Sequence, residues 1–227
     1  MFGFFFNSPA WQLIVQSDWM TKFVLLGLFL LSVVCFAIIA FKIISLNSQK
    51  RMTSELFNRM KKVQVFSDII SLGKEYRKSL GGKFLMQNLS ELKTLLDKNK
   101  EQKLTEQDFE YLGIIAEQSI DQLVTEGEIY LPILSTAAAS SPLIGLFGTV
   151  WGLIHAFVNI SQEKSADIAV VAPGIAEALT TTLAGILVAI PALIAFHYFS
   201  NELRKQEQQL GHLSDKFLNI IKQTFIK

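Results

Sequence analysis

The 227-residue sequence contains one cysteine, Cys35, which rules out a disulfide framework within the chain and a cysteine-rich metal site. Its three histidines are scattered without a ligand spacing such as HExxH, and no GxxxxGK[ST] motif for nucleoside triphosphates is present. Charged residues make up only 18% of the chain, and the net charge is +1, so the basic excess of a nucleic-acid-binding protein is missing. We therefore expect no catalytic residues, no metal, no cofactor and no nucleic acid partner.

Long apolar stretches dominate what is present. Residues 23–41 are nineteen uncharged residues, enough to cross a hydrocarbon core of roughly 30 Å as a helix. Residues 129–162 contain no Asp, Glu, Lys or Arg, and residues 168–201 contain one, Glu177. We predict an all-α membrane protein with transmembrane helices at 22–44, 129–158 and 170–199. A short turn, 159–169, joins the last two.

The remaining segments differ in character. Residues 1–21 are rich in Phe and Trp and almost uncharged, which favours a segment lying at the membrane surface. Residues 45–128 carry thirteen basic and thirteen acidic residues with helical periodicity, which predicts a soluble helical domain. Residues 200–227 have heptad-like apolar spacing, which predicts a helix that packs on this domain or on a neighbouring molecule.

Three amphipathic helices are expected in the soluble domain. We place breaks between them at Gly81-Gly82 and at the polar run 98–103. The last helix should begin near Thr105, with Glu106 and Asp108 in its first turn, and could continue without interruption into the second membrane helix.

Basic residues near the membrane ends predict the orientation. Lys42, Lys50, Arg51 and Arg59 follow the first membrane helix, and Arg204 and Lys205 follow the third. The N-terminal segment has no basic residue before Lys22, and the turn at 159–169 has only Lys164. Because basic residues favour the cytoplasmic side, we expect the N-terminus and the turn outside. Residues 45–128 and 200–227 are expected to be cytoplasmic.

The two later membrane segments carry small residues at steps of three and four, which allow helix backbones to approach closely in lipid. We assign this packing role to four glycines: Gly145, Gly148, Gly152 and Gly185. Pro142 and Pro191 lie inside the apolar runs and predict kinks, which a membrane helix tolerates when its neighbours satisfy the freed carbonyls.

Glu177 is the unusual residue of the third segment, because a carboxylate inside a spanning helix costs a few kcal/mol even on lenient scales. One interpretation is a carboxylate that reaches the outer interface. The other is a functional carboxyl that faces a polar cavity or a partner helix. On an ideal helix Thr181 lies within about 60° of Glu177, and Thr182 lies about 140° away. These hydroxyls, like that of Thr149, can face a pore or bond their own helix carbonyls.

Two strings of residues resemble the signature segments of the TolQ/ExbB/MotA family of inner-membrane energy-transducing proteins. They are SPLIGLFGTVWGLIHAF at 141–157 and VVAPGIAEALTTTLAGILVAIPALIAF at 170–196. The layout of three spans with a large insertion also resembles the family. The short N-terminus and the HAF after the first string resemble TolQ more than ExbB, and the match to four-span MotA is poor.

The resemblance implies a pentamer around a dimer of a single-span partner, TolR-like or ExbD-like, whose helix supplies a proton-accepting aspartate. Proton flow would then drive force transmission through a TolA-like or TonB-like protein towards the outer membrane. It implies a bacterial inner-membrane location. The family's pore-lining groups match Thr149, Glu177 and Thr182. The family has small residues where this chain has Thr180 and Thr181, a departure that makes the predicted lining more polar.

Three functional hypotheses follow. The first is a proton-channel subunit of a Tol-Pal type system, involved in outer-membrane integrity and cell division, with an ExbB-like subunit for TonB-dependent uptake as its alternative. The second is a structural membrane scaffold without proton flow. The third is a solute transporter subunit, although the sequence shows no substrate pocket.

Overall fold

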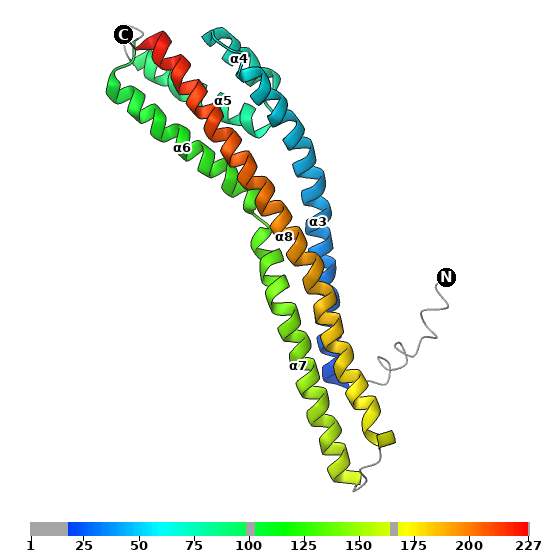
Figure 1. Cartoon of the computed structure of the whole chain (residues 1–227). Coiled ribbons are helices and arrows are strands. Elements are labelled where there is room, and N and C mark those ends of the chain that lie inside the picture. The colour runs from blue at the N-terminus through cyan, green and yellow to red at the C-terminus, as the bar shows by residue number, and fades with distance from the viewer. Residues whose placement is uncertain (1–17, 99–102, 164–167, 227) are drawn as a thin grey trace. The chain divides into compact units, whose positions relative to one another are not determined.

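The computed structural model describes residues 18–98, 103–163 and 168–226 (Figure 1). The described residues form α-helices and contain no strand, so the all-α prediction is confirmed. In chain order the helices are α3 (Trp19–Met60), α4 (Phe66–Glu75), α5 (Leu80–Lys98), α6 (Glu106–Glu128), α7 (Leu131–Glu163) and α8 (Ile168–Phe225). Most of the N-terminal segment predicted to lie at the membrane surface, residues 1–17, falls outside the described residues, as do residues 164–167 of the predicted turn.

Three of these helices are long and apolar enough to cross a membrane, as predicted: Trp19–Met60, Leu131–Ser161 and Val171–Phe225. Since α3 has 42 residues and α8 has 58, both are longer than the roughly 20 residues that a bilayer requires. Each therefore continues well beyond its apolar part, and each contributes to both compact units of the chain.

The chain divides into two units, which we call the membrane unit and the soluble unit. The membrane unit comprises residues Met1–Ala40 and Tyr130–His197, and the soluble unit comprises Phe41–Ile129 and Tyr198–Lys227. The described part of the membrane unit holds the first half of α3, α7 and the first half of α8.

The soluble unit has a continuous apolar core. The predicted C-terminal helix takes part in it, because Leu210, Leu213 and Phe217 of α8 are buried together with Leu56 of α3 and Leu112 of α6. The ring of Phe217 meets that of Phe84 edge to face at 6.2 Å. The final part of α8 therefore packs on its own chain, one of the two outcomes that the sequence allowed.

The predicted break at Gly81-Gly82 is wrong, because both glycines lie inside the first turn of α5. The interruption precedes them: α4 ends at Glu75, and Ser79 donates a backbone bond of 2.8 Å to the carbonyl of Tyr76. A Cβ at Gly82 would lie 2.0 Å from that carbonyl oxygen. Gly82 therefore serves this close approach rather than a turn.

The start of α6 agrees with the sequence. Thr105 is the N-cap and forms a capping box with Asp108, whose backbone N–H donates to the Thr105 hydroxyl at 3.1 Å. The end of α6 differs from the expectation of an uninterrupted helix, since α6 stops at Glu128 and α7 starts at Leu131. Pro132 explains the break, because a proline ring clashes with the carbonyl four residues earlier, here that of Glu128.

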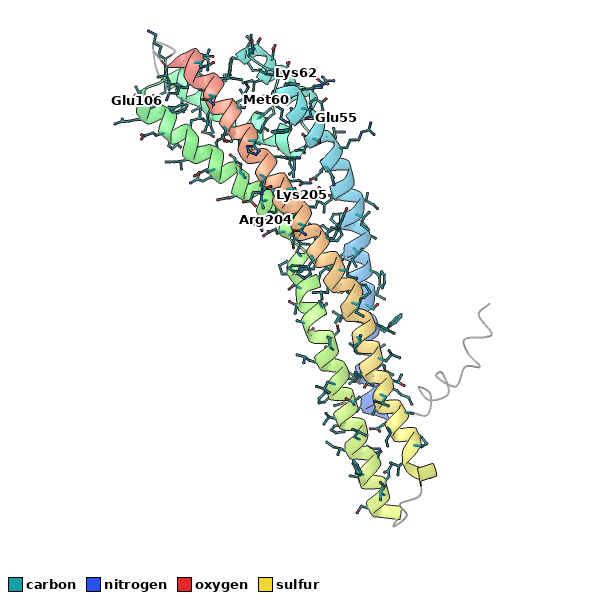
Figure 2. All side chains as sticks on the ribbon, in the orientation of Figure 1. Glu55, Met60, Lys62, Glu106, Arg204 and Lys205 are labelled. Carbon is teal, nitrogen blue, oxygen red and sulfur yellow. The ribbon has the colours of Figure 1, made fainter. Side chains whose placement is uncertain are left out.

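Two charged contacts join helices of the soluble unit. The Lys42 ammonium of α3 donates to the carbonyl of Gly127 in α6. Lys50 of α3 pairs with Glu202 of α8 at 3.0 Å, and this pairing raises the pKa of Lys50. Figure 2 shows Lys62, just after the end of α3, and the adjacent Arg204 and Lys205 of α8, three of the basic residues of this unit. Which side of the membrane they face stays a prediction.

Candidate proton pathway

Helices α7 and α8 pack at backbone distance over several turns. A Cβ added at Gly185 of α8 would lie 2.4 Å from the carbonyl oxygen of Ser141, and one at Gly145 of α7 would lie 2.8 Å from that of Thr181. Gly148 and Gly152 face Thr181 and Ala178 with equally little space, since an added Cβ would meet side-chain atoms at 2.5 and 2.9 Å. All four glycines selected from the sequence therefore lie where the two helices touch.

Three threonines lie along this contact. The Thr181 hydroxyl is fully buried and within bonding distance of two carbonyls, Gly145 of α7 at 3.0 Å and Ala178 of its own helix at 2.7 Å. Thr149 donates to Leu146 at 2.6 Å, and its oxygen lies 3.4 Å from the hydroxyl of Thr182. Thr149 and Thr182 thus form a cross-helix pair. Thr181, in contrast, holds the two backbones together, and a pore-lining role for it stays a prediction.

Glu177 lies one turn before Thr181 on α8, and its carboxylate accepts a hydrogen bond of 2.9 Å from the backbone N–H of Asp18. Asp18 directly precedes α3, and its carbonyl accepts the first backbone bond of that helix, from Lys22. A carboxylate beside the free N–H groups of a helix start is stabilised by the helix dipole. Glu177 therefore ties α8 to the beginning of α3, a contact that neither interpretation of its sequence position included.

A cavity of about 430 Å³ surrounds this contact in the membrane unit. Its polar lining comes from three helices and the residue before α3: Asp18, Thr21, Trp151, His155, Asn159 and Glu177. The indole N–H of Trp151 donates to the Asp18 carboxylate at 3.2 Å, which also connects α7 to the residue before α3. Among the described lining residues two are acidic and none is Lys or Arg, so the cavity favours cations.

The structure separates the predicted site residues into two groups. Thr149, Thr181 and Thr182 lie together between α7 and α8, whereas the described hydrogen bond of Glu177 leads to α3. Pro142 lies inside α7 and Pro191 inside α8, both within continuous helices. The kinks expected there stay predictions.

Sequence reasoning missed Asp18, Thr21 and Trp151 as members of the site. An acidic residue immediately before a long apolar helix is a usable signal, because Asp is a preferred N-cap. The tertiary contact of Trp151 with Asp18 leaves no such signal, since 133 residues separate the pair.

Comparison with known proteins agrees with this architecture. The MotA/TolQ/ExbB proton channel family matches residues 77–212. The biopolymer transport protein ExbB of Salmonella typhimurium is 33% identical over 223 residues, which cover 93% of this chain and 86% of the relative.

The chain belongs to the MotA/TolQ/ExbB proton channel family.

Within the family, similarity to individual members differs in extent. The Tol-Pal system protein TolQ of Haemophilus influenzae is 48% identical, but over 91 residues that cover 40% of either chain. TolQ of Pseudomonas aeruginosa is 43% identical over 97 residues, 41% of either chain. The TolQ matches are thus shorter but higher in identity, while the ExbB match runs along nearly the whole chain.

Proposed function

We propose that the chain is the multi-copy subunit of a proton-driven motor in a bacterial inner membrane. The observation that carries this is Glu177, the single carboxylate in the apolar stretch 168–201 of the third spanning helix, which lies in a polar cavity in a member of a proton channel family. A carboxylate placed among lipid-facing helices is costly, and a proton pathway gives it a use.

The pathway that we propose begins at Glu177 and continues along the Thr149–Thr182 pair, with Thr181 beside it. These groups cannot complete a pathway alone, because the described spanning segments offer few ionisable groups and three spans enclose little space. A single-span TolR-like partner, present as a dimer inside a pentamer of this chain, would supply the missing acid. The N-terminus would then face the periplasm, and the soluble unit and the end of α8 the cytoplasm.

We further propose that the assembly is of the Tol-Pal type and acts through a TolA-like protein in outer-membrane integrity and cell division. The higher identity to TolQ over the matched segment supports this. An ExbB-like role, with ExbD-like and TonB-like partners, is the second candidate. The nearly full-length similarity to ExbB favours it.

Two experiments test the proposal. Co-expression with a TolR-like and with an ExbD-like subunit, followed by affinity purification, identifies the partner by which subunit is retained in stoichiometric amount. Reconstitution of the retained complex in vesicles with an imposed pH gradient then measures proton flux. Flux above that of vesicles with either subunit alone supports a channel, whereas a stable complex without flux supports the structural scaffold instead.

A further inference from the structure

The cavity beside Glu177 contains a hydroxyl that the protein does not satisfy. Thr21 of α3 is 1% exposed and lines the cavity, and its Oγ1 has no hydrogen-bond partner among the described residues. Buried hydroxyls in proteins are almost always bonded to protein or water. A polar cavity of this size holds several water molecules of about 30 Å³ each, so water is the natural partner of the Thr21 hydroxyl.

The charges of the lining side chains determine which ions a water-filled cavity would attract. The carboxylates of Asp18 and Glu177 face the cavity, and His155 is the other titratable group of its lining. Lys22, the nearest described cation in sequence, is exposed and does not line the cavity. Low-dielectric walls concentrate the field of two carboxylates and can raise the local cation concentration by about 10–10³.

One side of the cavity lies at the surface of the subunit, at the end of the membrane unit that carries the start of α3. His155 is exposed, and Trp151, whose indole contacts the Asp18 carboxylate, is 39% exposed. From the water beyond that end of the spanning helices, a hydrated cation would reach Asp18 without crossing the close α7–α8 contact.

We propose that this cavity is a water-filled entry site that gathers hydrated cations, with Asp18 and Thr21 as its positioning residues, and that protons enter the channel through it. The second part rests on the proposed function. In that assignment Asp18 raises the rate at which external protons are captured, and it does not limit how fast they pass once Glu177 is reached.

The first experiment tests the cavity without requiring proton flux. In the purified complex, prepared with a partner subunit free of tryptophan, Trp11 and Trp19 are replaced by Phe, so that Trp151 is the one remaining tryptophan. Quenching of its fluorescence by Cs⁺, iodide and neutral acrylamide is then compared. The proposal expects Cs⁺ to quench more strongly than iodide relative to acrylamide, and Asp18→Asn to reduce the Cs⁺ preference at least twofold. The asparagine oxygen can still accept the indole N–H. Equal Cs⁺ and iodide quenching, or a preference that Asp18→Asn leaves unchanged, overturns the cation site.

The hydroxyl is tested by Thr21→Val, which keeps the shape of the side chain. If water satisfies the hydroxyl, the variant loses a hydrogen bond, and we expect its Tm to fall by a degree or more. If the site is dry, removing an unsatisfied buried group raises the Tm, and this result overturns a water-filled cavity. Thr136→Val is the matched control, because Thr136 is exposed near the other end of the membrane unit.

The second experiment measures proton flux in vesicles as external pH is varied in sodium-free buffer. For Asp18→Asn we expect half-maximal flux to need about fivefold more external protons, with the maximal flux within twofold of wild type, because one of two attracting charges is lost. Added salt should weaken this difference.

An equal loss of flux at every pH, or no change, overturns the assignment of Asp18 to proton entry. A wild-type complex that shows the Cs⁺ preference but conducts no protons contradicts the proposed function and the entry role while the cation site stands.

Discussion

The Glu177 carboxylate accepts a hydrogen bond of 2.9 Å from the backbone N–H of Asp18 and so fixes the start of the first spanning helix to the third. This contact gives Glu177 a structural role that is separable from its charge. A glutamine at this position keeps an oxygen that can accept the N–H, whereas an alanine does not.

We expect Glu177→Ala to lower the free energy of unfolding by about 0.5–1 kcal/mol, as for the loss of a helix cap. Glu177→Gln should lose less than half of that amount. Thermal unfolding of the purified protein in detergent distinguishes the two variants. Equal losses would show that the bond to Asp18 contributes nothing to stability.

The backbone contact at Gly185 predicts a large effect of a single methyl group. In Gly185→Ala the new Cβ would lie 2.4 Å from a carbonyl oxygen of Ser141, so α7 and α8 must move apart. We expect a loss of about 1–3 kcal/mol, as for overpacked cores, measured by unfolding in detergent. Gly27→Ala is the control, because no atom lies within 4 Å of its added Cβ. A control as unstable as Gly185→Ala would contradict this explanation.

The first turn of α5 makes an analogous prediction for the soluble unit. Gly82→Ala would place its Cβ 2.0 Å from the backbone carbonyl oxygen of Tyr76, which cannot rotate away. We expect a loss of about 2–3 kcal/mol. Gly113→Ala, in an open part of α6, should be neutral or slightly stabilising because alanine favours helices. Circular dichroism during thermal unfolding measures both, and a neutral Gly82→Ala would refute the steric argument.

The Glu202 side chain is 7% exposed and has two lysine neighbours, Lys50 at 3.0 Å and Lys205 at 3.9 Å. Removing the closer partner leaves a buried charge poorly compensated. We expect Lys50→Met to lower the stability of the protein, by an amount that solvent screening limits because the Lys50 side chain is half exposed. Lys205→Met should lower the stability at most about half as much. Equal losses for the two variants would contradict the conclusion that Lys50 is the main partner of Glu202.

The same pair has a defined pH dependence. Because Glu202 raises the pKa of Lys50, the stabilisation is fully present below the unfolded-state pKa of lysine, about 10.4, and is lost as pH rises through the higher folded-state value. The difference between wild type and Lys50→Met should therefore stay constant from about pH 7 to 9. Urea unfolding at several pH values measures it, and a difference that shrinks over this range would contradict the pairing.

Periodicity and composition predicted the elements of this fold well, because apolar runs and Thr105 with Asp108 are local signals. They failed at Gly81-Gly82 and at the α6–α7 junction. In the first case close contact of Gly82 with the Tyr76 carbonyl, not a turn at the glycines, required glycine, and in the second a single proline ended the helix. The first failure comes from reading glycine by its commonest role, and the second from extending the helix through Pro132.

The candidate site was predictable only in part. A single acidic residue in an apolar segment is visible in the sequence itself, so Glu177 could be selected without a structure. Its bond to Asp18 could not, since the pair is 159 residues apart and the bond involves a backbone group common to all sequences. The burial of Thr181 likewise depends on how α7 meets α8, which helical periodicity alone does not fix.

Proton flux through vesicles that contain the Glu177→Gln variant with its single-span partner tests most directly whether Glu177 carries protons. This variant retains the acceptor for the Asp18 N–H and removes the ionisable group. We expect an intact complex of wild-type size whose proton flux is at least tenfold lower than that of wild type. An intact complex with wild-type flux would contradict it and would leave Glu177 as a helix cap in a chain that conducts protons by another route.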